Sequence, residues 1–540
     1  MSPIAPCYKD LVTFVLEHDD YHPDKEVLID ALNPLQSITL NQARRYVRKL
    51  VGGLRRHTIT RGDTICVHAF NSVKYPLIFL GIIGAGGRFT GSNPSYTATE
   101  LAHHFRISQT RVVITCQAQL ETVRVAAQMS NVPPANIIVL DEPSTCTAHG
   151  ATSMHALMDG RGEDWQRFDD YDTASSTAAA LLSTSGTTGL PKMAIRSHLS
   201  WVAENQAIED ELEKPYEARR LLCVPFFHAF AAPLALISAL RSGHPTYVMT
   251  RFKQQDFLAA IARFKITETA MPPPLIVRFL AMQPDERAML KSIELVWCGG
   301  APLSEATQNS ALQMLAGSAR ICQVYGMTEG GWMTTFLYPE GDRTGSVGRP
   351  IGNYEVKIKH SDSDCVVSQH VVGEVLFRGS CTMSGYLNNV KATQEAFDQD
   401  GWLRTGDVGY INDAGKLYIL DRKKELIKVR GWQVAPAELE SCYMMHKDIV
   451  DAAVIGVSHP IDATEVPRAY LVRVSESSVS EREILSFASQ YLAKYKIMDC
   501  QIRFCDSIPK SASGKILKKV LRETGSDSGY ESAGGIGIEV

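Results

Sequence analysis

The sequence has 540 residues, of which 45% are hydrophobic and 21% are charged, and its formal net charge is -4. A chain of this length exceeds one ordinary hydrophobic core, so we expect a large domain and at least one smaller domain. The weak net charge excludes a general attraction to nucleic acid or to anionic membranes, so any polyanion must be bound at a local site.

The cysteines and the apolar segments indicate in which cellular compartment the protein resides. Twelve cysteines are scattered without a C-x-x-C pair, which argues against structural zinc and a disulfide framework and favours reduced thiols. The N-terminal segment lacks the basic and apolar regions of a signal peptide. The longest apolar stretch, residues 226–240, is short for a membrane span. We expect a cytoplasmic protein, a monomer or homodimer, with no membrane span and no nucleic-acid partner.

Strands and helices alternate along the first part of the chain. Strands are predicted at residues 178–182, 219–224, 245–250, 266–271, 293–298 and 319–326, and helices at 254–264, 272–282 and 303–315. This alternation favours an α/β fold with doubly wound, mostly parallel sheets. Ligands of such sheets lie beyond the carboxyl ends of the strands, where polar loops occur at 183–189, 299–303 and 325–331.

The pattern changes after residue 340. Strands at 372–379 and 415–420 indicate a β-rich subdomain, and a small α+β unit follows, with helices at 436–445, 481–495 and 514–523 and strands at 451–457, 468–474 and 501–505. Ser480 and Glu483 are spaced as a capping box for the second of these helices. We place the domain boundary near Arg422, which gives domains at 1–422 and 423–524, and we expect the Gly/Ser-rich tail at 525–540 to be disordered.

The segment LLSTSGTTGLPK, residues 181–192, is the most unusual local feature. Its hydroxyls, its two glycines and its closing lysine suit a phosphate cradle, in which backbone N–H groups turn toward the ligand. The composition alone favours a flexible surface loop. The chain has no G-x-x-x-x-G-K-[ST] string, which argues against a P-loop NTPase.

Six motifs in order resemble those of the adenylate-forming superfamily, which includes acyl-CoA synthetases, peptide-synthetase adenylation domains and beetle luciferases. They are STSGTTGLPK, PFFHAF, VYGMTEGG, GWLRTGDVG, DRKKELIKVRGWQVAPAELE and PKSASGKILKK, and they extend over most of the chain. The hinge string ELIKVRGWQVAPAELE is most similar to 4-coumarate–CoA ligase-like acyl-CoA ligases. The resemblance implies a large N-terminal ATP- and acyl-binding domain and a small mobile C-terminal domain.

The implied reaction joins a carboxylic acid to coenzyme A, with ATP and Mg²⁺, through an acyl-adenylate. A carboxylate has a poor leaving group, whereas AMP leaves readily from the adenylate when a thiol attacks. Both steps concentrate negative charge, so a metal ion, amide dipoles and lysines should dominate catalysis, and no protein nucleophile is needed. We expect an aromatic or a medium-chain acid as substrate.

The resemblance also implies a nucleotide site. Glu329 would hold the metal, Thr328 the α-phosphate and Asp407 the ribose hydroxyls, while Tyr325 would stack on adenine. Outside the motifs, a Thr-Glu pair is often a helix cap and an Asp after Gly is often a turn residue, and Lys192 could be a solvated loop lysine. The other nucleotide-binding candidates are Ser183, Thr184, Ser185, Gly186, Thr187, Thr188, Gly189, Gly300, Ala301, Pro302, Gly326, Met327 and Arg422.

Lysines near the C-terminus carry the implied catalytic and hinge roles. Lys515 would bridge the substrate carboxylate and the α-phosphate, and Lys424 would be the hinge about which the small domain turns. Lys428 and Gln433 match hinge-loop positions. The alternative is that this charged segment only connects the two domains. The residues that would line the channel for the thiol of the cofactor are Arg430, Gly431 and Trp432.

His228 in PFFHAF resembles the acyl-binding histidine, although a histidine among aromatic residues is usually a core residue. Trp332 is bulky for its place and would shorten the acyl pocket if it points inward. One departure is Met193, where the superfamily usually has glycine after the loop lysine. The remaining pocket candidates are Phe226, Phe227, Phe230, Cys298, Gly299, Gly330 and Gly331.

Three alternatives stay open at this point. A stand-alone adenylating enzyme would load a carrier protein, and a luciferase-like oxygenase would oxidise the same adenylate. A non-catalytic homologue would only bind ligands, but the intact Lys515, Glu329 and Asp407 argue against it.

Overall fold

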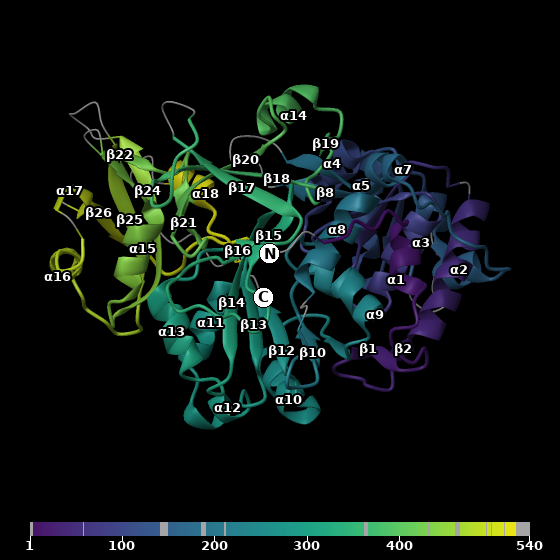
Figure 1. The fold of residues 1–540 in the computed structure, drawn as a ribbon, viewed down its shortest axis with the longest axis horizontal. Coiled ribbons are helices and arrows are strands. Elements are labelled where there is room, and N and C mark those ends of the chain that lie inside the picture. The colour runs from purple at the N-terminus through teal and green to yellow at the C-terminus, as the bar shows by residue number, and fades with distance from the viewer. Residues whose placement is uncertain are drawn as a thin grey trace.

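The computed structural model describes residues 4–57, 59–140, 150–184, 191–209, 212–360, 365–429, 432–458, 465–492, 494–497, 499–511 and 514–524. The predicted tail at 525–540 and most of the phosphate loop, 185–190, lie outside the described residues. In the described part, two large sheets come first, and a β-rich sheet and a small α+β unit follow them (Figure 1).

One large sheet has eight strands. Its inner neighbours are parallel, whereas β9 turns back antiparallel beside β8, and β19 pairs with β9 on the outside. The order is β19 (Gly385–Tyr386), β9 (Lys192–Ser197), β8 (Ala178–Thr184), β4 (Arg88–Gly91), β3 (Thr64–His68), β5 (Thr110–Thr115), β6 (Ile137–Val139) and β7 (Thr152–Ser153).

The other large sheet has nine strands, and its central strands are all parallel. The outer strands β2, β15 and β16 pair antiparallel. The order is β16 (Arg349–Pro350), β15 (Gly331–Thr335), β14 (Arg320–Met327), β13 (Leu295–Gly299), β12 (Glu268–Met271), β10 (Arg220–Leu222), β11 (Thr246–Val248), β1 (Glu26–Asp30) and β2 (Ser37–Thr39).

Helices cover and separate the two sheets. Every residue of α3 (YPLIFLGIIG) is buried, as expected of a helix that is apolar on all sides. Here α3 spans Tyr75–Gly84, and a π-helix, Pro233–Ser238, leads directly into α9. The other α-helices of this part are α1 (Leu11–Leu16), α2 (Leu40–Arg56), α4 (Ala98–Ser108), α5 (Leu120–Met129), α6 (Met154–Met158), α7 (Tyr171–Ser176), α8 (His198–Ile208), α9 (Ala239–Ser242), α10 (Gln254–Phe264), α11 (Pro273–Leu280), α12 (Pro284–Ala288) and α13 (Glu305–Leu312).

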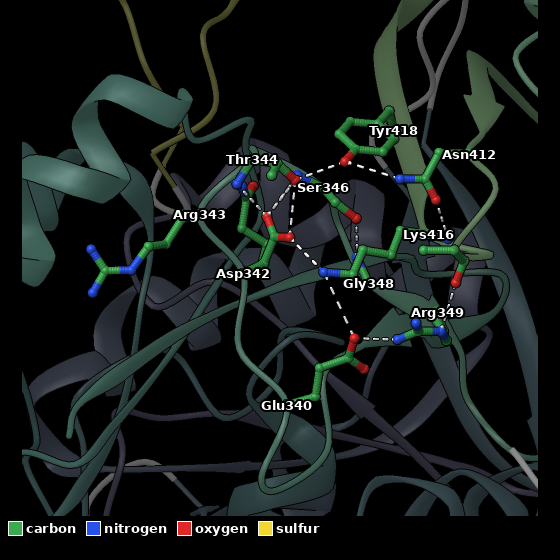
Figure 2. A network of polar contacts seen from close by, with 12 residues as sticks. Glu340, Asp342, Arg343, Thr344, Ser346, Gly348, Arg349, Asn412, Lys416 and Tyr418 are labelled. Carbon is green, nitrogen blue, oxygen red and sulfur yellow. Dashed lines mark hydrogen bonds and ion pairs between the residues drawn. The ribbon is translucent and has the colours of Figure 1, made fainter.

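An antiparallel four-stranded sheet forms the predicted β-rich region, with α14 (Val390–Ala396) beside it. Figure 2 shows how the loop after β15 is fixed to this sheet: the buried Asp342 carboxylate accepts from the Thr344 N–H at 2.8 Å and from Lys416 Nζ at 2.9 Å. This network anchors the hairpin that carries Asp407 and Arg422. The strand order is β17 (Tyr354–Lys359), β18 (Gly373–Gly379), β20 (Leu403–Ile411) and β21 (Leu417–Arg422).

The C-terminal elements gather at one side of the molecule, where Figure 1 shows α15–α17 and β24–β26 together. The capping box of Ser480 and Glu483 is confirmed at the start of α16. The unit contains the hairpin β22 (Ile427–Val429) and β23 (Trp432–Val434), the sheet β24 (Ile449–Ser458), β25 (Glu465–Arg473) and β26 (Gln501–Phe504), and the helices α15 (Pro436–Met444), α16 (Glu481–Ala488), α17 (Lys494–Ile497) and α18 (Lys518–Thr524).

Two helix predictions in the C-terminal part were too long by several residues. The helix expected at 481–495 ends at Ala488. The helix expected at 514–523 begins only at Lys518, because Gly514 has a φ of +79° and Ile516 pairs as a β-bridge with Lys510. A left-handed residue and a bridge cannot continue a helix, so Lys515 lies in a tight turn instead.

The predicted fold class is confirmed: an α/β fold with mixed, mostly parallel large sheets, a β-rich subdomain and an α+β C-terminal part. The domain boundary near Arg422 stays a prediction. Among the described residues, none of the helices has the length and apolar character needed to cross a membrane.

Candidate active site

The carboxyl ends of β10, β12, β13 and β14 meet at one edge of the nine-stranded sheet, because these neighbours are parallel. The segments that follow them carry four of the predicted elements: PFFHAF after β10, the prolines that open α11 after β12, the GGAP loop after β13 and the TEGG turn after β14. The topology therefore brings together motifs that are far apart in the sequence.

Tyr325, Asp407 and Arg422 form one cluster. The Tyr325 hydroxyl donates to Asp407 Oδ2 at 2.6 Å, and Arg422 Nε lies 3.2 Å from Asp407 Oδ1. Asp407 is buried, and its N–H donates to Thr405 Oγ1 at 3.0 Å. Burial raises the pKa of the Asp407 carboxyl, and the Arg422 guanidinium opposes that shift. The cluster offers a carboxylate that is held in place by its neighbours, which suits recognition of a diol.

Glu329 and Lys192 both contact the side chain of Tyr386. The Tyr386 hydroxyl donates to Glu329 Oε1 at 2.7 Å, and Lys192 Nζ lies 4.9 Å from the centre of the Tyr386 ring. The backbone C=O of Glu329 accepts from the Met383 N–H at 2.7 Å. Sequence reasoning missed Tyr386, since it lies on a two-residue strand outside the six motifs and no spacing links it to Glu329.

Lys515 reaches this edge from the far end of the chain. A Cβ atom at Gly514 would lie 3.0 Å from Pro274 Cγ, so the turn packs closely on the start of α11. Burial and the nearby Arg422 guanidinium lower the pKa of the half-buried Lys515, while Asp407, Glu425 and Glu329 oppose that shift. The ammonium group thus lies in the field of the ribose and metal candidates.

His228 is half-buried at the start of the acyl motif. Its Nδ1 accepts from the Phe230 N–H at 3.3 Å. Burial, assisted by the positive charge of Lys515, lowers the pKa of His228 to about 4. The imidazole is therefore neutral at physiological pH, and it can accept or donate a hydrogen bond but carries no charge.

This pKa predicts a pH profile. A histidine with a lowered pKa gains its proton only as the pH falls toward about 4, so His228 keeps one charge state from pH 6 to 8. We expect acid-dependent pyrophosphate exchange to show no limb near the ordinary histidine pKa of about 6.5. The measurement is log kcat/KM against pH for the wild type and His228→Ala. A limb near 6.5 that disappears in His228→Ala would contradict the prediction.

Aromatic rings form a wall next to the TEGG turn. Phe230 and Trp332 stack with ring centres 5.9 Å apart, and Trp332 Nε1 donates to the Phe230 C=O at 2.9 Å. Trp297 packs on Trp332 from β13 at 6.2 Å. A Cβ at Gly299 would lie 2.7 Å from the Phe230 ring, which explains the glycine there. Burial raises the pKa of the Cys298 thiol, so Cys298 is an uncharged apolar group.

The other two phenylalanines of PFFHAF differ in burial. The Phe226 ring is fully buried against Tyr75, with centres 6.0 Å apart. Phe227 is half-buried, and a Cβ at Gly91 would lie 2.3 Å from Phe227 Cβ. Phe226 thus packs in the core, and a pocket role for either ring stays a prediction.

The loops after β13 and β14 hold the remaining nucleotide candidates. Gly300 has a φ of +90° and is exposed together with Pro302, while Ala301 is half-buried. A Cβ at Gly326 would lie 2.1 Å from the Gly331 carbonyl oxygen, so only glycine fits. The half-buried residues Met327 and Thr328 follow, and the buried Gly330 and Gly331 complete the turn.

The structure describes the two strand ends that flank the phosphate loop. Ser183 and the buried Thr184 end β8, and Lys192 opens β9 opposite Thr184. Met193 is buried, and its C=O accepts from the Leu387 N–H at 2.9 Å. Met193 is thus a sheet residue. The candidates Ser185, Gly186, Thr187, Thr188 and Gly189 lie outside the described residues.

The hinge candidates are only partly described. Lys424 is exposed in the turn after β21, and the backbones of Lys428 and Gln433 pair in the β22–β23 hairpin. The side chains of Lys428, Gln433 and Trp432, and the residues Arg430 and Gly431, lie outside the described part. Their roles stay predictions.

The chain matches the AMP-binding enzyme family over residues 16–387 and the AMP-binding enzyme C-terminal domain over residues 438–515. It therefore belongs to the AMP-binding enzyme family. The phenylacetyl-CoA ligase epaB of Aspergillus niger is 42% identical over 521 residues, which are 95% of this chain and 96% of that protein. The 4-coumarate–CoA ligase 1 of Petroselinum crispum is 33% identical over 96% of this chain and 94% of its own length.

Within the family, the chain is an AMP-forming acyl-CoA ligase. The structure of ATP-bound MatB from Rhodopseudomonas palustris has a TM-score of 0.83 at 25% identity, over 96% of this chain and 99% of that chain. The apo structure of the same protein scores 0.72. By this score, the described arrangement is more similar to the ATP-bound form of that protein.

Proposed function

We propose that this ligase converts an aromatic carboxylic acid on a short linker into its CoA thioester. The observation that carries the proposal is the stack of the buried Trp332 on Phe230, with Trp297 behind it. A wall of flat rings favours a flat, rigid substrate over a long flexible chain. Relatives are named for phenylacetyl, nicotinic and coumaric acids, which supports an aromatic acid here as well.

We propose that Glu329 binds Mg²⁺, with Thr328 beside it at the α-phosphate. Glu329 is a buried carboxylate at a strand end, and Mg²⁺ favours one or two carboxylates together with phosphate oxygens. When bound, the metal supplies charge neutralisation at the phosphates. Asp407 would then accept from the ribose hydroxyls, Arg422 would orient it, and Tyr325 would face the adenine.

We propose that Lys515 neutralises the charge that develops as the acid attacks the α-phosphate, while the neutral His228 orients the carboxylate. The second half-reaction would follow a turn of the small domain about Lys424, with Lys428 and Gln433 near the thiol path. The domain boundary near Arg422 is part of this proposal.

Acid-dependent and CoA-dependent release of AMP across a panel of acids tests the substrate proposal. We expect the highest kcat/KM for phenyl- and heteroaryl-carboxylic acids with short linkers. Straight-chain acids of equal carbon number serve as the matched comparison. Equal or higher kcat/KM for the straight-chain acids would overturn the aromatic proposal but leave the ligase activity standing.

Replacement of Trp332 tests directly whether the stacked rings determine which acids are accepted. We expect Trp332→Ala to accept longer acids, because loss of the ring leaves a cavity beside Phe230, and to lower stability by about 3–5 kcal/mol. The measurement is the chain-length profile of AMP release, with thermal unfolding alongside. Trp165→Ala removes an equally buried tryptophan elsewhere and should lower stability without changing the profile. An unchanged profile in Trp332→Ala would contradict the prediction.

A further inference from the structure

A fully buried ion pair lies behind the turn that carries Glu329. Arg196 in β9 and Glu204 in α8 lie 2.8 Å apart between Nη2 and Oε2, and each side chain is 1% exposed. Neither residue belongs to the six motifs. Burial of two charges is costly, and an apolar pair of the same shape is often equally stable, so such a pair is weak support for stability alone.

The second oxygen of Glu204 is bound to the turn itself. Glu204 Oε1 accepts from the Trp332 backbone N–H at 2.8 Å. A Cβ at Gly331 would lie 2.4 Å from this oxygen, so the carboxylate rests directly on the backbone of the turn. Gly331 has a φ of +65°, which also favours glycine.

The Arg196 end is connected to the phosphate loop. Arg196 belongs to β9, whose first residue, Lys192, follows that loop. Its Nε donates to Ser200 Oγ at 3.2 Å, and its guanidinium lies 5.2 Å from the Trp201 ring. The pair therefore joins the strand after the phosphate loop to the turn of the metal carboxylate.

Two more hydrogen bonds fix the same turn. The Gly330 C=O accepts from the Tyr354 hydroxyl at 2.6 Å, and the Glu329 C=O accepts from the Met383 N–H at 2.7 Å. Together with the bond from Trp332 to Glu204, they hold three consecutive backbone units. The bond to Glu204 is the one with a charged acceptor, and such bonds are the stronger ones.

We propose that Glu204, with Arg196 as its counter-ion, is a positioning residue for adenylation. It fixes the backbone of the turn that carries Glu329, so that the carboxylate is held in one position for the proposed Mg²⁺. The proposal rests on the proposed metal role of Glu329. Glu204 acts through the backbone of the turn.

The test uses the full chain and two variants. Glu204→Gln keeps the shape and an acceptor, and the pair Arg196→Met with Glu204→Leu removes both charges and keeps an apolar filling. Pyrophosphate exchange is measured against Mg²⁺ concentration. Thioester formation is measured separately from supplied acyl-adenylate and CoA, since this step needs no phosphate-bound metal. Glu268→Gln is the control, because Glu268 pairs with Arg220 at 2.9 Å, is equally buried and lies at the opposite end of its strand.

We expect the double variant to need about tenfold more Mg²⁺ for half-maximal exchange, and Glu204→Gln to need an intermediate amount. Thioester formation from supplied adenylate should stay within about twofold, and Glu268→Gln should keep the wild-type Mg²⁺ dependence. Wild-type Mg²⁺ dependence in both Glu204 variants would overturn the positioning role and leave the metal role standing. Wild-type Mg²⁺ dependence in Glu329→Gln would overturn the metal role and this proposal with it.

Discussion

Lys515→Ala should abolish acid-dependent pyrophosphate exchange, with a loss of at least about 10²-fold in kcat. The ammonium group of Lys515 interacts electrostatically with Asp407, Glu329 and His228. The alanine variant lacks this positive charge at the step in which negative charge develops on the oxygens of the transferred phosphoryl group. Stability should change little, because the main-chain bonds of the turn, from Ser511 N–H to the Lys515 C=O and from Gly514 N–H to the Ser511 C=O, do not need the side chain.

Exchange of labelled pyrophosphate into ATP, with thermal unfolding alongside, measures this effect. Lys519→Ala is the matched control, since Lys519 lies four residues away and its side chain is 84% exposed. It should keep wild-type exchange. Normal exchange in Lys515→Ala would remove Lys515 from the reaction.

The lowered pKa of Lys515 adds a pH signature to the same experiment. A lysine whose pKa is lowered by burial loses its proton, and with it the charge, at a lower pH than usual. Exchange by the wild type should therefore begin to fall at alkaline pH below the ordinary lysine value of about 10.4. The residual exchange of Lys515→Ala should lack that limb.

Much of the large domain is predictable because its signals are local. The helix expected at residues 254–264 has the bounds of α10, and the strands at 266–271, 293–298 and 319–326 contain β12, most of β13 and most of β14. Their apolar runs, turn residues and helical periodicity suffice to define them. The helix expected at 514–523 begins late for a tertiary reason: the β-bridge between Lys510 and Ile516 overrides helical propensity around Lys515.

The site is predictable only where it follows the motifs. Tyr325, Asp407 and Arg422 come together as the motif order suggests. Tyr386 and Glu204 have no such signal, because their contacts to the TEGG turn depend on how β19 and α8 pack against it. Single residues that support a site through tertiary contacts carry no local sequence pattern, so the sequence alone does not reveal them.

Glu329→Gln should lower kcat/KM for MgATP by about 10²–10³-fold. Glutamine has the same shape and can still accept from the Tyr386 hydroxyl, which lies 2.7 Å from the Glu329 carboxylate. The substitution therefore removes the charge and leaves the packing. A neutral amide is a poor ligand for a hard divalent cation, so the phosphates should lose much of their neutralisation.

Pyrophosphate exchange at varied free Mg²⁺, at fixed saturating acid, distinguishes this cause from a general loss of fold. The loss should be partly recovered at high Mg²⁺ if weakened metal binding causes it, and thermal unfolding should stay close to the wild type. Tyr386→Phe removes only the hydroxyl bond and should cost far less, because the carboxylate charge stays. A Glu329→Gln loss that Mg²⁺ never relieves, equal to that of Tyr386→Phe, would assign Glu329 a packing role, since the charge would then be irrelevant to the rate.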